Sequence, residues 1–157
     1  MRDLDEIDLR ILNILQTNSD ITTKELALQV NLSPTPVFER VKRIEKEGYI
    51  TKYVAILNAD KLSRGFIVFC NIRLKHHSKE LGLQFMNSIK DINAITECYN
   101  ISGDYDFMLK IHVENMPHYQ DFVLNTLGKI ENIGSLQSLF VMGEIKHTYA
   151  IPLVAQK

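Results

Sequence analysis

The chain has 157 residues, of which 45% are hydrophobic and 24% are charged, proportions that are ordinary for an ordered globular protein with one large domain or two small ones. Its formal net charge of −1 provides no overall attraction to nucleic acid, so any such affinity must come from locally concentrated basic residues. We interpret the two cysteines, Cys70 and Cys98, as buried hydrophobic residues rather than as a disulfide or a ligand pair. No apolar run approaches the length of a membrane span, and the first residues lack the apolar core of a signal peptide. We therefore expect a soluble, cytoplasmic protein.

The first predicted helix lies between Asp5 and Asn18. Apolar residues recur at spacings of three and four from Leu4 to Leu15, which predicts a helix with one apolar face. Asp5 is its expected N-cap, and Asp8 follows three residues later.

A second, short helix is predicted after Thr22. Thr22 and Glu25 have the spacing of a capping box, in which each side chain satisfies a backbone N–H of the first turn. This helix can extend only to Val30, because Asn31 tolerates the left-handed conformation found at helix C-termini.

A third helix follows at once. Ser33 is a suitable N-cap and Pro34 a suitable first helical residue, and the helix should extend to about Glu47, where Gly48 ends it. Two short helices joined by such a sharp turn form a helix-turn-helix corner.

The third helix is basic. Five basic residues and two acids lie between Arg40 and Lys52, whereas Asp3 to Asp8 contains four acids and no base. Such a charge run is often only a solvated helix face, but its position on the second helix of a helix-turn-helix favours DNA binding. Residues of the first turns, Thr35 and Glu39 among them, would contact base edges, and the later arginines and lysine would contact phosphates or guanines. The candidate DNA-binding residues are Ser33, Thr35, Pro36, Phe38, Glu39, Arg40, Lys42 and Arg43.

The β-branched and aromatic run from Tyr49 to Leu57 predicts one or two strands, a small wing, followed by a connector from Asn58 to Gly65. After it the periodicity predicts strand, helix, strand, strand, helix, strand. The predicted elements are Phe66–Leu74, Lys79–Lys90, Ile95–Ile101, Phe107–Val113, Asn115–Leu127 and Ser135–Met142, with a further extended segment over Ile145–Leu153.

This doubled β-α-β pattern predicts a ferredoxin-like βαββαβ plait, an antiparallel sheet with two helices on one face. The fold class is therefore α+β, with a winged helix-turn-helix domain at residues 1–50, a strand or hinge connector at 51–64 and a C-terminal domain at 65–157. No third helix remains to cover the second face of the sheet. We therefore expect a homodimer that pairs two such sheets.

Sequence motifs of enzymes are absent: there is no glycine-rich phosphate loop, His-Glu-x-x-His, Cys-x-x-Cys or nucleophile elbow. We expect no catalytic residue, metal or cofactor, and interpret His76-His77 as a solvated turn. The loop Ser102–Asp106 is either a simple hairpin turn or a ligand site. In a ligand site, glycine N–H groups would bind a carboxylate and Asp104 or Asp106 an ammonium, which together match a free amino acid.

Five segments spread essentially end to end along the chain form a distinctive combination: Leu4–Leu12, Leu32–Pro36, Arg40–Glu45, Ile101–Asp106 and Val141–Lys146. In this combination the chain resembles the leucine-responsive regulatory protein/AsnC (feast/famine) family of bacterial and archaeal transcription regulators. Ser33–Pro36 and Glu97–Tyr99 are most similar to the leucine-responsive branch. The resemblance implies dimers that often assemble into octamers, with an amino-acid effector bound at the interface between dimers. The effector-binding residues it implies are Tyr99, Gly103, Asp104, Tyr105, Asp106, Gln137, Ser138 and Leu139.

One segment departs from the family. Leu136–Phe140 stands where threonine-rich or tyrosine-containing sequences are common, which leaves the identity of the amino acid open.

The sequence thus predicts a cytoplasmic, nucleoid-associated regulator that binds double-stranded DNA with sequence specificity and responds to an amino acid. Two alternatives remain: an architectural protein that wraps DNA with little sequence preference, and an enzyme resembling the siroheme decarboxylases that share this architecture. The enzyme would need a tetrapyrrole pocket faced by His112, His118 or His147.

Overall fold

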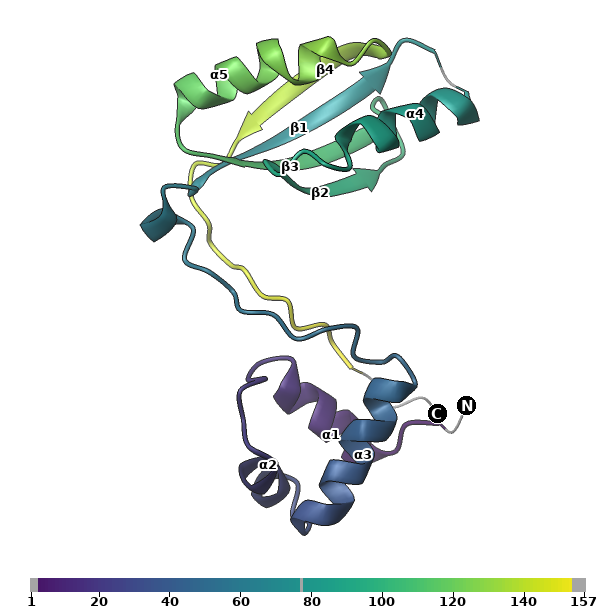
Figure 1. Cartoon of the computed structure of the whole chain (residues 1–157), viewed down its shortest axis with the longest axis vertical. Helices are drawn as coiled ribbons and strands as arrows, with labels where there is room; N and C mark the ends of the chain where they lie inside the picture. Colours follow the sequence, from purple (N-terminus) through teal and green to yellow (C-terminus); the bar gives the residue numbers. More distant parts are fainter. Residues whose placement is uncertain (1–2, 77, 154–157) are drawn as a thin grey trace. The chain divides into compact units, whose positions relative to one another are not determined.

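The computed structural model describes residues 3–76 and 78–153, which form two compact units (Figure 1). One unit contains the chain up to Ile56 together with the segment from Ile145, and the other contains Leu57–Glu144. The segment from Ile145 was assigned to the C-terminal domain from the sequence, but its contacts group it with the N-terminal helices. Gln16, for example, exchanges two 3.0 Å hydrogen bonds with the backbone of Ile151. None of the helices in these described ranges is both long and apolar enough to cross a membrane.

The N-terminal unit contains the three predicted helices. The expected capping box of Thr22 and Glu25 forms at the second helix. At the first helix Asp5 is the expected N-cap, and it also forms a capping box by exchanging side-chain and backbone hydrogen bonds with Asp8. These bonds satisfy N–H groups that the first turns leave unpaired. The helices are α1 (Glu6–Leu15), α2 (Thr23–Gln29) and α3 (Pro34–Lys46).

The turn between α2 and α3 has the predicted backbone. Asn31 adopts a left-handed conformation with φ of 55°, and Gly48, after α3, has φ of 81°. Ser33 occupies the N-cap position of α3, although its side chain makes no capping hydrogen bond. Ala27 is only 1% exposed, and its small side chain allows α2 and α3 to pack closely. The helix-turn-helix is therefore confirmed.

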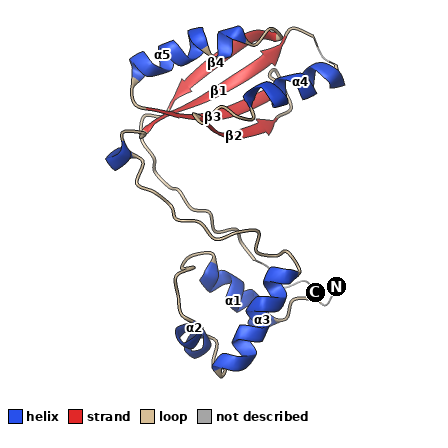
Figure 2. Ribbon diagram, viewed as in Figure 1, coloured by secondary structure: helices blue, strands red, loops and turns tan. Residues whose placement is uncertain are grey.

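The predicted strands of the wing do not form. The segment from Ile50 to Asn58 is extended without strand pairing (Figure 2), and Val54, Ile56 and Leu57 are 60–69% exposed. β-Branched and aromatic residues favour strands only where a neighbouring strand can pair and pack with them, and the described chain supplies none here.

The C-terminal unit is the predicted plait. Its sheet has the strand order β2 (Ile95–Asn100), β3 (Phe107–Val113), β1 (Phe66–Leu74), β4 (Ile133–Phe140), and every pair is antiparallel. Figure 2 shows both longer helices on one side of this sheet. The helix α5 (Met116–Asn125) ends two residues before the predicted Leu127, where a short 3₁₀ turn, η2 (Leu127–Lys129), begins. The elements are η1 (Asp60–Leu62), β1 (Phe66–Leu74), α4 (Lys79–Ile89), β2 (Ile95–Asn100), β3 (Phe107–Val113), α5 (Met116–Asn125), η2 (Leu127–Lys129) and β4 (Ile133–Phe140).

Along the central strands β1 and β3, successive side chains point alternately to the two faces of the sheet. One set of side chains is buried against Phe85 of α4 and against Tyr119 and Phe122 of α5. The intervening residues of β1 and β3 must point to the opposite face, because successive side chains of a strand alternate. No described helix covers that face, which we call the open sheet face. The buried set is Val68, Cys70, Ile72, Leu74, Phe107, Leu109, Ile111 and Val113.

An ion-pair cluster around the buried Asp8 fixes α3 against α1 in the N-terminal unit. Asp8 is 1% exposed, and its two carboxylate oxygens accept hydrogen bonds from Arg40, at 2.7 Å, and from Arg43. Arg40 also binds Asp5 at 2.6 Å. The hydrogen bonds to Asp5 and Asp8 raise the pKa of Arg40. We call these four residues the Asp8 cluster.

We predict that Asp8→Asn destabilises the N-terminal unit. The substitution keeps the shape of the side chain but removes the charge that two arginines share. The free energy of unfolding should fall by about 2–3 kcal/mol, somewhat less than for fully buried pairs, because both guanidinium groups remain partly exposed. Hydrogen exchange of the α1 and α3 amides measures this loss.

Asp3→Asn is the matched control, since it removes an exposed carboxylate from the same segment and should change stability by less than about 0.5 kcal/mol. If Asp8→Asn lowered the free energy of unfolding as little as Asp3→Asn does, the cluster would contribute nothing to stability.

Candidate DNA-binding surface and effector loop

Most side chains in the first turns of α3 are exposed. Val37 and Ile44 are fully buried on the other side of the helix and hold it against the core of the N-terminal unit. The Lys42 Nζ lies 5.8 Å from the centre of the Phe38 ring and 2.9 Å from a carboxylate oxygen of Glu45. The predicted DNA-binding residues that are exposed are Ser33, Thr35, Pro36, Phe38, Glu39 and Lys42.

Arg40 and Arg43 were also predicted to bind DNA, but the structure places them differently. Both were expected to contact phosphates or guanines, but their guanidinium groups bind the carboxylates of the Asp8 cluster, and their side chains are only about one-quarter exposed. Arg43 Nη1 is buried without a hydrogen-bond partner. Their partners lie more than thirty residues earlier in the chain, so helical periodicity gave no indication of them. The structure therefore leaves Lys42 and Lys46 as the exposed bases of α3.

The loop between β2 and β3 is tied to the end of β1. Gly103 has φ of 113°, a conformation that favours glycine, and a Cβ at this position would meet open space. Asp106 donates its N–H to the Ile72 carbonyl at 2.8 Å, and its carboxylate accepts the N–H of Leu74 at 2.8 Å. Asp106 therefore acts in the structure as an anchor for the loop.

Arg73 holds the same loop, and the sequence analysis did not identify it as a site residue. Its Nε donates to the Asp104 carbonyl at 2.6 Å, and its Nη2 lies 3.8 Å from a carboxylate oxygen of the same residue. Its guanidinium carbon is 5.9 Å from the centre of the Tyr105 ring. Arg73 lies between the buried Ile72 and Leu74 and is exposed, but nothing in the sequence indicated its partners.

The remaining predicted effector residues are divided between the two faces of the sheet. Gln137 pairs with Asn71, Leu139 with Phe69 and Tyr99 with Met108, so all three lie on the open sheet face. Ser138 pairs with the buried Cys70 and points to the helix layer instead, where its hydroxyl lies 2.6 Å from that of Tyr119. Ser138 thus faces the side of the sheet opposite to Gln137 and Leu139, because adjacent strand residues face opposite sides.

Tyr119 itself is buried at this contact. Burial raises the pKa of its hydroxyl to about 12, even though Ser138 favours the ionised form. The hydroxyl thus stays protonated, and the pair serves the packing of α5 on the sheet.

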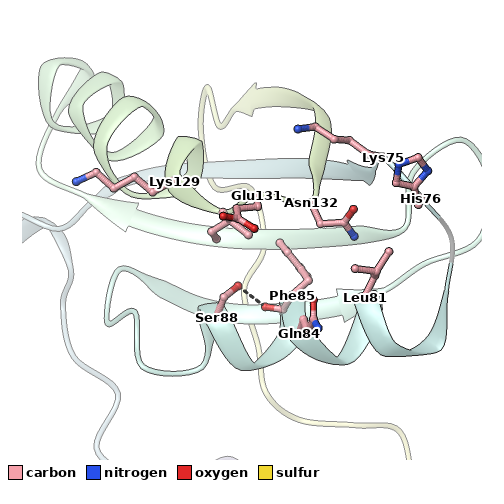
Figure 3. Close-up of a pocket in the computed structure, with 10 residues that line it drawn as sticks. Lys75, His76, Leu81, Gln84, Phe85, Ser88, Lys129, Glu131 and Asn132 are labelled. Carbon is pink, nitrogen blue, oxygen red and sulfur yellow. Dashed lines mark hydrogen bonds between the residues drawn. The ribbon is translucent and has the colours of Figure 1, made fainter.

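A pocket of about 450 Å³ lies elsewhere in the C-terminal unit, between α4 and the connection from η2 to β4 (Figure 3). Leu81, Phe85 and Ile130 form its apolar lining, and Lys75 and Lys129 add basic groups. None of the predicted effector residues contributes to this lining, so the pocket is distinct from the loop.

The histidines give no support to a tetrapyrrole site. His112 Nδ1 lies 3.1 Å from the Arg64 carbonyl, and His118 Nδ1 lies 2.9 Å from Asn115 Oδ1. His147 packs against the Tyr149 ring in the segment grouped with the N-terminal unit. Among residues 3–76 and 78–153, no three His, Cys, Asp or Glu side chains are placed to bind a metal ion.

The two cysteines have different environments. Cys70 is buried as expected, and burial raises the pKa of its thiol. Cys98 is exposed, contrary to the prediction, because β2 is an edge strand of the sheet.

We predict that the acceptor oxygen of Asp106, more than its charge, maintains the loop. Asp106→Ala removes the acceptor of the Leu74 N–H and should lower the free energy of unfolding by about 1–2 kcal/mol, whereas Asp106→Asn keeps an oxygen there and should lower it less. Urea denaturation and hydrogen exchange of the Leu74 amide measure the two effects.

Asp104→Ala is the control within the same loop, since its side chain is 93% exposed. If Asp106→Ala were as mild as Asp104→Ala, the anchoring role of Asp106 would be excluded.

Two models of known protein families match this chain. Residues 4–51 match the model of a winged helix-turn-helix DNA-binding domain, and residues 67–151 match that of the Lrp/AsnC ligand binding domain. The chain is 37% identical over 147 residues to the leucine-responsive regulatory proteins of Klebsiella pneumoniae and Escherichia coli K12, with 94% of this chain and 90% of each relative covered.

Solved structures of transcriptional regulators also resemble this chain over nearly its whole length. A transcriptional regulator of Neisseria meningitidis in complex with L-Met superposes with a TM-score of 0.91 at 32% identity, covering 95% of this chain and 96% of that one. An AsnC family transcriptional regulator from Agrobacterium tumefaciens gives a TM-score of 0.90 at 35% identity, covering 95% and 97%. With its helix-turn-helix and its ligand-binding plait, the chain belongs to the Lrp/AsnC family of DNA-binding transcription regulators.

Proposed function

We propose that this regulator recognises specific DNA sequences through α3 and that a free amino acid bound at the loop 102–106 regulates it. The observation that best supports sequence recognition is the Asp8 cluster. It fixes α3 from behind while Thr35, Glu39 and Lys42 remain exposed in front.

The exposed groups of α3 have complementary uses on DNA. The Glu39 carboxylate can accept a hydrogen bond from the exocyclic amine of cytosine, and the Thr35 hydroxyl can bond to several base edges. Lys42 can bind a phosphate or a guanine. With so few bases free and a net charge of −1, a single copy binds weakly. Useful affinity then requires two or more recognition helices acting together.

The open sheet face supports a homodimer as the means of joining those helices. Ile67 and Phe69 of β1, Met108 of β3 and Leu139 of β4 give this face an apolar centre. Beside them, Lys110 and Glu97 form an ion pair at 3.1 Å. A second copy of the same face can bury the apolar centre through a twofold axis, and larger assemblies such as octamers can be built from these dimers.

An amino-acid effector is consistent with the chemistry of the loop. Gly103 borders open space, so that a carboxylate can approach the backbone of the loop, and Tyr99, Gln137 and Leu139 stand on the adjoining face. The Neisseria regulator was solved in complex with L-Met, which supports an amino acid as the ligand class here.

DNA binding tests the first part of the proposal. We expect the wild-type chain to bind its own promoter far more tightly than a random duplex at every salt concentration. Lys42→Ala should weaken binding to both duplexes and lower the log–log salt slope by about 0.9 per copy bound. Fluorescence anisotropy over a salt series measures both quantities.

Lys79→Ala, which removes an exposed base from α4, is the matched control and should leave the slope unchanged. Equal affinity for promoter and random DNA would exclude sequence-specific regulation and favour an architectural, DNA-wrapping protein.

Sedimentation velocity tests the dimer. We expect wild-type protein to sediment as a dimer or a larger assembly, and Phe69→Glu to yield folded monomers, because it places a charge at the apolar centre of the proposed interface. Leu124→Glu makes the same change on α5, where the side chain is 73% exposed, and should preserve the dimer. A dimer that survives Phe69→Glu would place the interface elsewhere.

A further inference from the structure

We propose that Arg73 and Asp104 together bind the two charges of the effector: the Arg73 guanidinium binds the α-carboxylate, and the Asp104 carboxylate binds the α-ammonium. The proposal rests on the amino-acid response proposed above and names the groups that recognise the ligand.

The role of Asp106 motivates this assignment. Of the two aspartates expected to bind an ammonium, Asp106 directs its carboxylate to the Leu74 N–H and its own N–H to the Ile72 carbonyl. A group that maintains the loop by these bonds is poorly suited to exchange them for a ligand. Asp104, whose side chain is 93% exposed, is the accessible anion of the loop.

Arg73 is the cation beside it. Its bond to the Asp104 carbonyl, at 2.6 Å, fixes the guanidinium against the loop backbone. Its Nη2 is 3.8 Å from the Asp104 carboxylate, beyond the length of a good hydrogen bond, and half of the Arg73 side chain is exposed. An exposed ion pair with such a long N–O distance contributes little to the free energy of unfolding. A ligand can therefore replace it with little loss of stability.

The pair is complementary to a zwitterion. An α-amino acid has a carboxylate and an ammonium on neighbouring atoms, and each can take the place of the opposite protein charge. Guanidinium groups bind carboxylates through two parallel N–H donors, a geometry that lysine does not provide. The open space at Gly103, next to Asp104, provides room for the ligand.

The Tyr105 ring restricts the movement of the guanidinium. It lies 5.9 Å from the Arg73 guanidinium carbon and is itself only partly exposed. An aromatic face at this distance attracts the cation. Arg73 is thus held at both the backbone and the ring, while the outer edge of its guanidinium group stays accessible.

The test uses titration calorimetry of the full-length protein with L-methionine, L-methioninamide and N-acetyl-L-methionine, after a first screen of the common amino acids. The amide lacks the carboxylate charge and the acetylated compound lacks the ammonium charge. We expect wild-type protein to bind each analogue about tenfold more weakly than the free amino acid, or weaker still.

The variants assign each charge to its residue. Arg73→Gln should weaken L-methionine binding by about tenfold and abolish the preference for the acid over the amide. Arg73→Lys should restore only part of that preference, because the paired donors are lost. Asp104→Asn should abolish the preference for the free amine over the acetylated compound.

Arg64→Gln is the matched control. Arg64 also forms an exposed pair at 3.8 Å, with Glu114, in the same unit, so this variant loses the same charge away from the loop. It should bind all three compounds as the wild type does, and circular dichroism checks that each variant is folded.

The outcomes separate the two proposals. If wild-type protein bound no amino acid in the screen, the amino-acid response itself would fail, and the assignment with it. If wild-type protein bound and discriminated the three compounds but Arg73→Gln kept the same preferences, only the assignment of Arg73 would be overturned.

Discussion

The sheet of the C-terminal unit has two faces, and two helices can cover only one of them. Val68, Cys70 and Ile72 of β1 are completely buried against the layer of α4 and α5. Because strand residues alternate, their neighbours Phe69 and Arg73 must then point the other way. The proposed dimer interface and the proposed ligand-binding arginine therefore both result from the packing of the hydrophobic core.

This arrangement suggests how a ligand could influence assembly. The loop 102–106 is attached to the last residues of β1 through Asp106 and Arg73, and the earlier residues of the same strand contribute Ile67 and Phe69 to the open sheet face. An effector that replaced the Arg73–Asp104 contact would act on a strand that also belongs to the proposed interface. A small molecule bound there would thereby act on the proposed interface without contacting DNA.

In the N-terminal unit, some basic residues of α3 stabilise the fold and others remain exposed for binding. Arg40 and Arg43 are on the basic helix, yet their guanidinium groups are used to fix α3 to Asp5 and Asp8. Fewer phosphate contacts per copy then remain for DNA, which is consistent with recognition by several copies. The same ion pairs keep the exposed face of α3 in one orientation, as discrimination between base pairs requires.

The sequence by itself determined the local elements: the N-cap at Asp5, the capping box of Thr22 and Glu25, the left-handed Asn31, the start of α3 at Pro34, and the positions of β1 and β3. These depend on residues a few positions apart, so spacing and side-chain type are sufficient to predict them. Only the tertiary structure decided that Arg40 binds Asp8, that Asp106 binds the Leu74 backbone, that Arg73 meets Asp104, and that the run after Gly48 stays unpaired. Contacts between residues some thirty positions apart depend on how the elements pack, and a strand forms only when a partner strand lies beside it.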